Sequence, residues 1–136
     1  MTDYLASCLQ QYNCEPSGLN LTDRKVHGKP ADDIQNISMM AQMGPIRFEL
    51  IQPVSGESVQ KEFLETRGEG VNHLEFVVDN LEEEVAKLAE KGVKVISSGI
   101  FSEGGNFAYL NTDKTGGIIF DFFELPQIRS RYRKRT

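Results

Sequence analysis

Residues 70–96, GVNHLEFVVDNLEEEVAKLAEKGVKVI, predict a strand, a helix and a second strand. In the first strand, apolar residues alternate with a set that contains His73 and Glu75. Successive side chains of a strand point to opposite faces, so these two polar residues share one face and the apolar residues share the other. The apolar face has a partner in the amphipathic helix that follows. The face that carries His73 and Glu75 must therefore meet water, a cleft or a ligand.

The rest of the chain extends this pattern in both directions. Asn80 with Glu83 forms a helix start signal, and Gly68 and Gly92 are positioned to end helices. The predicted elements are a helix at 3–13, a weak strand at 19–26, a hairpin of strands 34–42 and 46–52, a short helix within 55–70, and then strand 71–78, helix 81–91 and strands 93–100, 106–111 and 117–124. The second half is a complete βαβββ unit, and the first half is the same unit without its leading strand. The sequence therefore predicts an α+β fold.

Composition excludes several classes of protein. The chain has 136 residues, of which 39% are apolar and 26% charged, as in an ordinary single-domain globular protein. No apolar run approaches the roughly 20 residues that span a bilayer, and no signal peptide is visible, so we expect no membrane partner. With only two cysteines, Cys8 and Cys14, a reducing cytoplasmic location is expected.

Charge is distributed unevenly along the chain. The net charge is −5, although the segment 126–136 is strongly basic. The body of the chain is therefore acidic, which argues against nucleic acid as a partner. The basic tail is expected to be a solvated end; an alternative is that it grips an anionic ligand or another subunit.

Two segments together resemble a known superfamily. GEGVNHLEFVVDNLEEEVAKLAEKGVKVI, followed by FAYLNTDKTGGIIFDFFEL, is similar to the vicinal oxygen chelate proteins, especially the branch of methylmalonyl-CoA epimerase and glyoxalase. The superfamily also contains extradiol dioxygenases and bleomycin resistance proteins. The resemblance implies paired βαβββ modules that form a cupped, mixed, barrel-like sheet. Within one domain at 1–125, it implies an incomplete first module at 1–54, a linker helix at 55–70 and a second module at 71–125, followed by the basic tail.

The resemblance also implies a divalent metal ion, such as Zn, Ni, Co, Fe or Mn. Its ligands would be Glu49, His73 and Asp121, each on a strand whose other side is apolar. The superfamily usually has Glu where this chain has Asp121, and its fourth ligand, a histidine, lies on the leading strand that the predicted first module lacks. We do not expect His27, in a loop, to replace that histidine. The alternative is that the three residues face solvent on a one-sided sheet.

The chemistry implied by the resemblance is metal-stabilised enolate formation. A carboxylate removes a proton beside a carbonyl while a Lewis acid neutralises the developing oxyanion. Asp121, Glu49 and Glu75 are the candidate catalytic residues, and Arg47 is a candidate for binding an anionic group of the substrate. The expected function is a lyase or isomerase acting on a small carbonyl acid or thioester.

Two other functions remain open. One is a metal-free protein of the same fold that binds a small molecule, as a resistance or carrier protein does. The other is a structural partner that a second chain completes. Because a missing strand leaves a sheet edge open, a homodimer is expected under every interpretation.

Overall fold

The computed structural model describes residues 15–16, 20–114 and 116–126. The chain divides into two compact units, residues 1–18 with 33–56 and residues 19–32 with 57–136. The helix predicted at 3–13 and nearly all of the basic tail lie outside the described residues.

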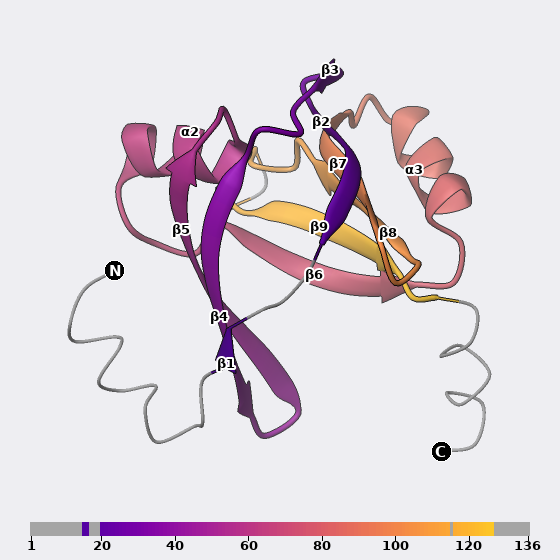
Figure 1. The fold of residues 1–136 in the computed structure, drawn as a ribbon. Coiled ribbons are helices and arrows are strands. Elements are labelled where there is room, and N and C mark those ends of the chain that lie inside the picture. Colours follow the sequence, from indigo (N-terminus) through magenta and orange to yellow (C-terminus); the bar gives the residue numbers. More distant parts are fainter. Residues whose placement is uncertain (1–14, 17–19, 115, 127–136) are drawn as a thin grey trace. The chain divides into compact units, whose positions relative to one another are not determined.

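The first unit contains a three-stranded antiparallel sheet in the order β1-β4-β5 (Figure 1). Its strands are β1 (Glu15–Pro16), β4 (Gln35–Met43) and β5 (Ile46–Ser55). The predicted hairpin is confirmed as β4 and β5, which turn at Gly44 with φ +61°. β5 continues past the predicted end at residue 52, because Gln35 pairs with Ser55 at the far end of the hairpin.

The second unit contains a six-stranded sheet in the order β3-β2-β7-β8-β9-β6. Every neighbouring pair is antiparallel except β6 and β9, which are parallel. With this mixed sheet and two helices, the fold is α+β, as predicted. The elements are β2 (Leu21–Val26), β3 (Lys29–Pro30), α2 (Val59–Arg67), β6 (His73–Val78), α3 (Leu81–Ala89), β7 (Val95–Phe101), β8 (Asn106–Leu110) and β9 (Ile119–Glu124).

Both described helices begin and end at capping residues. The Ser58 side chain accepts a hydrogen bond from the Lys61 amide at 3.1 Å, and Gly68, at φ +76°, ends α2. At α3, the Asn80 side chain accepts from the Glu83 amide at 3.0 Å, as the sequence predicts. Among the described residues, no helix has the length and apolar character needed to cross a bilayer.

The core of the second unit lies between the sheet and its helices. Leu110 and Leu81 are buried there, and α3 packs on β8 and β9. One expectation about packing is wrong. The apolar face of β6 is only partly covered by a helix, since Leu74 and Phe76 remain 45% and 43% exposed. The reason is that β6 is the edge strand, beyond the strands on which α3 packs.

The turn before β8 requires a residue without a side chain. Gly105 has φ +92°, and a Cβ there would lie 2.6 Å from the Glu124 carbonyl oxygen. We expect Gly105→Ala to lower the free energy of unfolding by about 1–2 kcal/mol for the left-handed backbone and by about 1–3 kcal/mol more for the backbone clash. Urea unfolding measures this loss. The control is Gly28→Ala, which has φ +76° and open space around its Cβ. An equal loss in both variants would show that the close approach at Gly105 has no cost.

Candidate functional site

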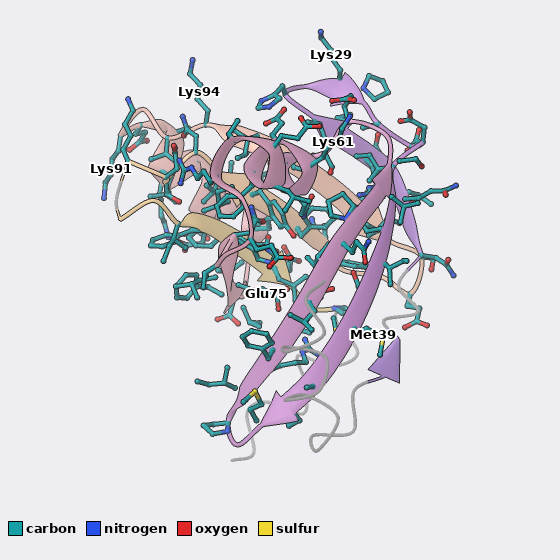
Figure 2. All side chains as sticks on the ribbon, turned by 90° about the vertical axis from the view of Figure 1, so that its left-hand side faces the viewer. Lys29, Met39, Lys61, Glu75, Lys91 and Lys94 are labelled. Carbon is teal, nitrogen blue, oxygen red and sulfur yellow. The ribbon has the colours of Figure 1, made fainter. Side chains whose placement is uncertain are left out.

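Three proton-carrying side chains lie in register across β6, β9 and β8. Glu75 of β6 is directly opposite Asp121 of β9, and Asp121 is directly opposite Tyr109 of β8. Residues opposite each other on adjacent strands project from the same face of a sheet. Glu75, which Figure 2 labels, Asp121 and Tyr109 therefore form one row, called here the polar row.

The two ends of the polar row differ in exposure. Asp121 is 3% exposed and Tyr109 is 7% exposed, whereas Glu75 is exposed to solvent. A buried carboxylate is rare unless its surroundings compensate for lost hydration. The row thus leads from a solvent-facing acid at the edge strand to a buried acid and a buried phenol.

His73 lies beside the polar row. It precedes Glu75 by two positions on β6, so its side chain is on the same face of the sheet. Its ring centroid lies 4.7 Å from that of Tyr109, and its Nε2 lies 3.4 Å from the Tyr109 hydroxyl. Because β9 separates β6 from β8, this contact passes over β9, the strand that carries Asp121. The two rings therefore help to cover that strand.

Four side chains form a hydrogen-bonded series through His73. The Gln60 side-chain amide donates to the Tyr109 hydroxyl at 3.1 Å, and Asn72 Oδ1 lies 2.9 Å from His73 Nδ1. A carbonyl oxygen can only accept, so the proton of the neutral imidazole belongs on Nδ1. Nε2 then carries the lone pair and accepts from the Tyr109 hydroxyl.

Burial determines the charge of His73. It lowers the pKa of the imidazole to about 4, because the charged form loses hydration. His73 is therefore neutral near pH 7. A neutral imidazole with its Nδ1–H held by an oxygen and its Nε2 lone pair directed outward is the form that binds metal ions in proteins.

The C-terminus of α2 fixes the loop that leads into β9. Arg67 donates to the Gly117 carbonyl at 2.7 Å and to Asp113 at 3.2 Å. Within the loop, the Thr112 hydroxyl accepts from the Phe120 amide at 2.8 Å. These contacts set where β9 begins and so help to place Asp121 in the polar row.

The second unit contains two of the three predicted metal ligands. His73 and Asp121 lie on adjacent strands and face the same side, and imidazole nitrogen with carboxylate oxygen fits a divalent ion of the predicted group. Glu49, half buried, and Arg47, exposed, lie on β5 of the first unit, so their roles stay predictions. Within the described ranges, no three His, Cys, Asp or Glu side chains form a group that could hold a metal.

Three residues of the site were missed in the sequence: Gln60, Asn72 and Tyr109. Tyr109 had a usable signal, since its neighbours Phe107, Ala108 and Leu110 are apolar and a buried tyrosine hydroxyl usually finds a hydrogen-bond partner. Gln60 had none, because a glutamine in a short helix is ordinarily a surface residue. Asn72 precedes the strand, where side-chain direction does not follow from alternation.

A separate hollow of about 300 Å³ lies between α3 and strands β7 and β8. Its lining includes Val85 of α3 with Ile100 and Ala108 of the sheet. Ile100 and Ala108 alternate with residues on the face of His73 and Tyr109, so they project from the opposite face. The hollow is therefore not part of the site described above.

Comparisons with known proteins agree on one fold. Residues 5–109 match the profile of a family described as the glyoxalase/bleomycin resistance protein/dioxygenase superfamily. An uncharacterized protein of Bacillus subtilis strain 168 is 29% identical over 86 residues, a match that spans 61% of each chain. So the match spans less than two thirds of that relative's length.

Two solved structures are similar across most of both chains. A hypothetical protein from Bacillus halodurans C-125 has a TM-score of 0.65 at 23% identity, covering 92% of this chain and 86% of the other. Methylmalonyl-CoA epimerase from Mycobacterium tuberculosis has a TM-score of 0.60 at 19% identity, covering 93% and 84%. At these sequence identities, the structural similarity shows that this chain and the two proteins share a fold.

The half-buried, neutral His73 makes the free energy of unfolding depend on pH between about pH 6.5 and pH 4. The unfolded state binds a proton near pH 6.5 and the folded state only near pH 4, so His73 favours unfolding as the pH falls through this range. We expect this residue to remove on the order of 3 kcal/mol of the free energy of unfolding between pH 7 and pH 4. Urea unfolding at several pH values measures the loss.

Two variants isolate this effect. His73→Gln should lose less stability than the wild type between pH 6.5 and pH 4. The control is His27→Gln, which replaces a histidine whose side chain is exposed. Parallel curves for the wild type and His73→Gln would contradict a neutral His73.

Proposed function

Since this chain belongs to the glyoxalase/bleomycin resistance protein/dioxygenase superfamily, we propose that it is an isomerase or lyase that transfers a proton at the carbon beside a carbonyl group. The observation that carries the proposal is the polar row, in which Glu75 and Asp121 lie directly opposite each other. Two carboxylates on one face can divide the work, one by removing the proton and the other by placing the charge that stabilises the enolate. A face meant only to bind an apolar molecule has no need of a buried acid.

The proposed reaction begins with a carboxylate that removes the proton from the carbon. The electron pair of the broken C–H bond moves into the carbon–carbon bond of an enolate, and the negative charge develops on the carbonyl oxygen. A second, protonated acid then returns a proton to the carbon. Return to the opposite side inverts the carbon, which is isomerisation; loss of a group from the neighbouring atom instead is a lyase reaction.

The developing oxyanion needs a positive charge or a hydrogen-bond donor nearby. A divalent ion, when bound by His73 Nε2 and the Asp121 carboxylate, would supply that charge as a Lewis acid. Glu75, which is exposed, is then the carboxylate that remains to remove the proton. The resemblance assigns two further roles. Glu49 would be another metal ligand or the base, and Arg47 would bind an anionic group of the substrate.

The substrate class is a small carbonyl acid or its thioester. The likeness to methylmalonyl-CoA epimerase supports a thioester, because that protein's name states its substrate. Thioesters also suit the chemistry, since their α-protons are more acidic than those of carboxylates. We further propose a homodimer in the cytoplasm, for which the open edge at β6 provides one pairing surface.

A second candidate is a metal-free protein that binds a small aromatic molecule. Its support is a series of aromatic rings on the face that carries the polar row. Phe101 lies 5.6 Å from Phe107 and 5.2 Å from Phe123 between ring centroids, and Phe107 lies 5.4 Å from Tyr109. Phe101 and Phe123, which are half-buried, could stack on a planar ligand. Binding without proton exchange would favour this candidate.

The test is exchange of the α-proton for deuterium. Methylmalonyl-CoA and a small set of other 2-substituted acyl thioesters are incubated with the protein and a divalent metal in D₂O, and mass spectrometry follows the gain of one deuterium. We expect Asp121→Asn and Glu75→Gln each to slow exchange about 100-fold to 10,000-fold, since each removes a group that carries the proton or places the charge.

The matched control is Glu69→Gln, an exposed acid on the loop between α2 and β6. It should exchange at the wild-type rate, and circular dichroism should show that all three variants fold. If no thioester of the set exchanges, or if both site variants exchange as fast as Glu69→Gln, the proton-transfer proposal is wrong.

A further inference from the structure

The hollow between α3 and the sheet exists because small side chains form its floor. Ser98 of β7 lies directly opposite Ala108 of β8, so both project from the same face of the sheet. α3 packs on β8 and β9, and the short side chains toward β7 do not fill the space beside the helix. An open volume of about 300 Å³ remains there. This volume is at the lower end of the range for small-molecule sites.

The walls of the hollow are apolar and partly exposed to solvent. Val85 of α3 and Val95 and Ile100 of β7 line it. Ile100 is 45% exposed and Val95 is 38% exposed. A ligand that covered these side chains would remove apolar surface from water, which favours binding.

The hollow also contains two polar groups that can orient a ligand. Asn106 lies directly opposite Ile100, so its side chain projects from the same face as the apolar wall. The Ser98 hydroxyl belongs to the floor. An apolar pocket with a few polar groups is the usual composition of a small-molecule site.

The charged side chains at the hollow are acids. Of the described residues that line it, Asp23 of β2 and Glu82 of α3 are charged, and both are exposed, so they lie at its mouth. Lys25 lies 3.3 Å from Asp23 and offsets part of its charge. Glu82 is therefore the carboxylate that attracts a cation to the hollow most strongly.

We propose that the hollow is a second ligand site, which binds a small molecule with an apolar ring and a positively charged amino group. The ring covers Val85 and Ile100, and the amino group lies beside Glu82. The site does not depend on the proposed function, because it lies on the face of the sheet opposite the polar row. It also differs in place from the aromatic surface of Phe101 and Phe123.

The test is an NMR titration at pH 7 with three indoles of similar shape. Tryptamine carries an ammonium group, 3-ethylindole has no charge, and indole-3-propionate carries a carboxylate. We expect tryptamine to give saturable shifts of the backbone amides of Val85, Ile100 and Ala108, and no shift at His73 or Glu75. Tryptamine should bind about twofold to fivefold more tightly than 3-ethylindole, since an exposed ion pair contributes modestly. Indole-3-propionate should bind most weakly.

Two variants test the acid and the floor separately. Glu82→Gln should weaken tryptamine binding about twofold to fivefold and leave 3-ethylindole binding unchanged. The matched control is Glu90→Gln, which removes the same charge from an exposed acid at the other end of α3 and should bind tryptamine like the wild type. Ser98→Leu places a branched side chain on the floor, so it should bind neither tryptamine nor 3-ethylindole. Circular dichroism checks that each variant folds.

Three results would overturn the proposal. The first is a set of tryptamine shifts centred on Phe101 and Phe123, because the ligand would then bind the other face. The second is equal affinity for tryptamine and 3-ethylindole, or equal weakening in Glu82→Gln and Glu90→Gln. The third is the absence of saturable shifts with tryptamine. If Ser98→Leu does not fold, the comparison of Glu82→Gln with Glu90→Gln decides alone.

Discussion

The parallel pairing of β6 with β9 is the constraint on which the site depends. It is the only parallel pair in the described sheets, and it sets Glu75 opposite Asp121 and His73 opposite Ile119. A shift of this register by one residue would turn every side chain of β6 to the other face, bringing Leu74 and Phe76 to the side of Asp121. The proximity of two acids, a phenol and an imidazole thus follows from one choice of register, and the hydrogen bonds of Tyr109 and Gln60 are consequences of it.

Helix α2 supports that register from outside the sheet. Gln60 on its first turn reaches the hydroxyl of Tyr109, and Arg67 at its end holds the loop that precedes β9. The Arg67 guanidinium also lies 5.6 Å from the Phe63 ring, which limits its freedom. These contacts are spaced along one helix, so a movement of α2 would disturb both the phenol and the start of β9. The short helix between the two halves of the sequence is therefore part of the site rather than a simple linker.

Sequence reasoning recovered the longer strands and both helices of the described residues because alternation and capping are local signals. The two-residue strands β1 and β3 were not predicted, since a strand that short shows no alternation. His73, Glu75 and Asp121 could be found since each interrupts an apolar alternation on a single strand. Two kinds of feature could not be found. Exposure at the edge of a sheet depends on strand order, which the sequence does not show. Leu74 and Phe76 were expected to pack against the following helix, but that helix packs on β8 and β9 and leaves them exposed. The contact between Gln60 and Tyr109 joins residues that lie far apart in the sequence, so no local pattern predicts it. The charge of His73 depends on burial, which the sequence of its own strand does not show.

The β6–β9 pair also has a consequence for how the chain acquires its structure. The neighbouring pairs β7–β8 and β8–β9 join strands that follow each other in the sequence, whereas residue 73 must meet residue 119 after α3, β7 and β8 have intervened. Contacts between distant positions carry the larger loop-closure entropy and form slowly. The meander of β7, β8 and β9 can therefore assemble first, with Asp121 and Tyr109 already opposite each other. The edge strand that brings His73 and Glu75 is added to it afterwards, so the polar row becomes complete only after the meander has formed.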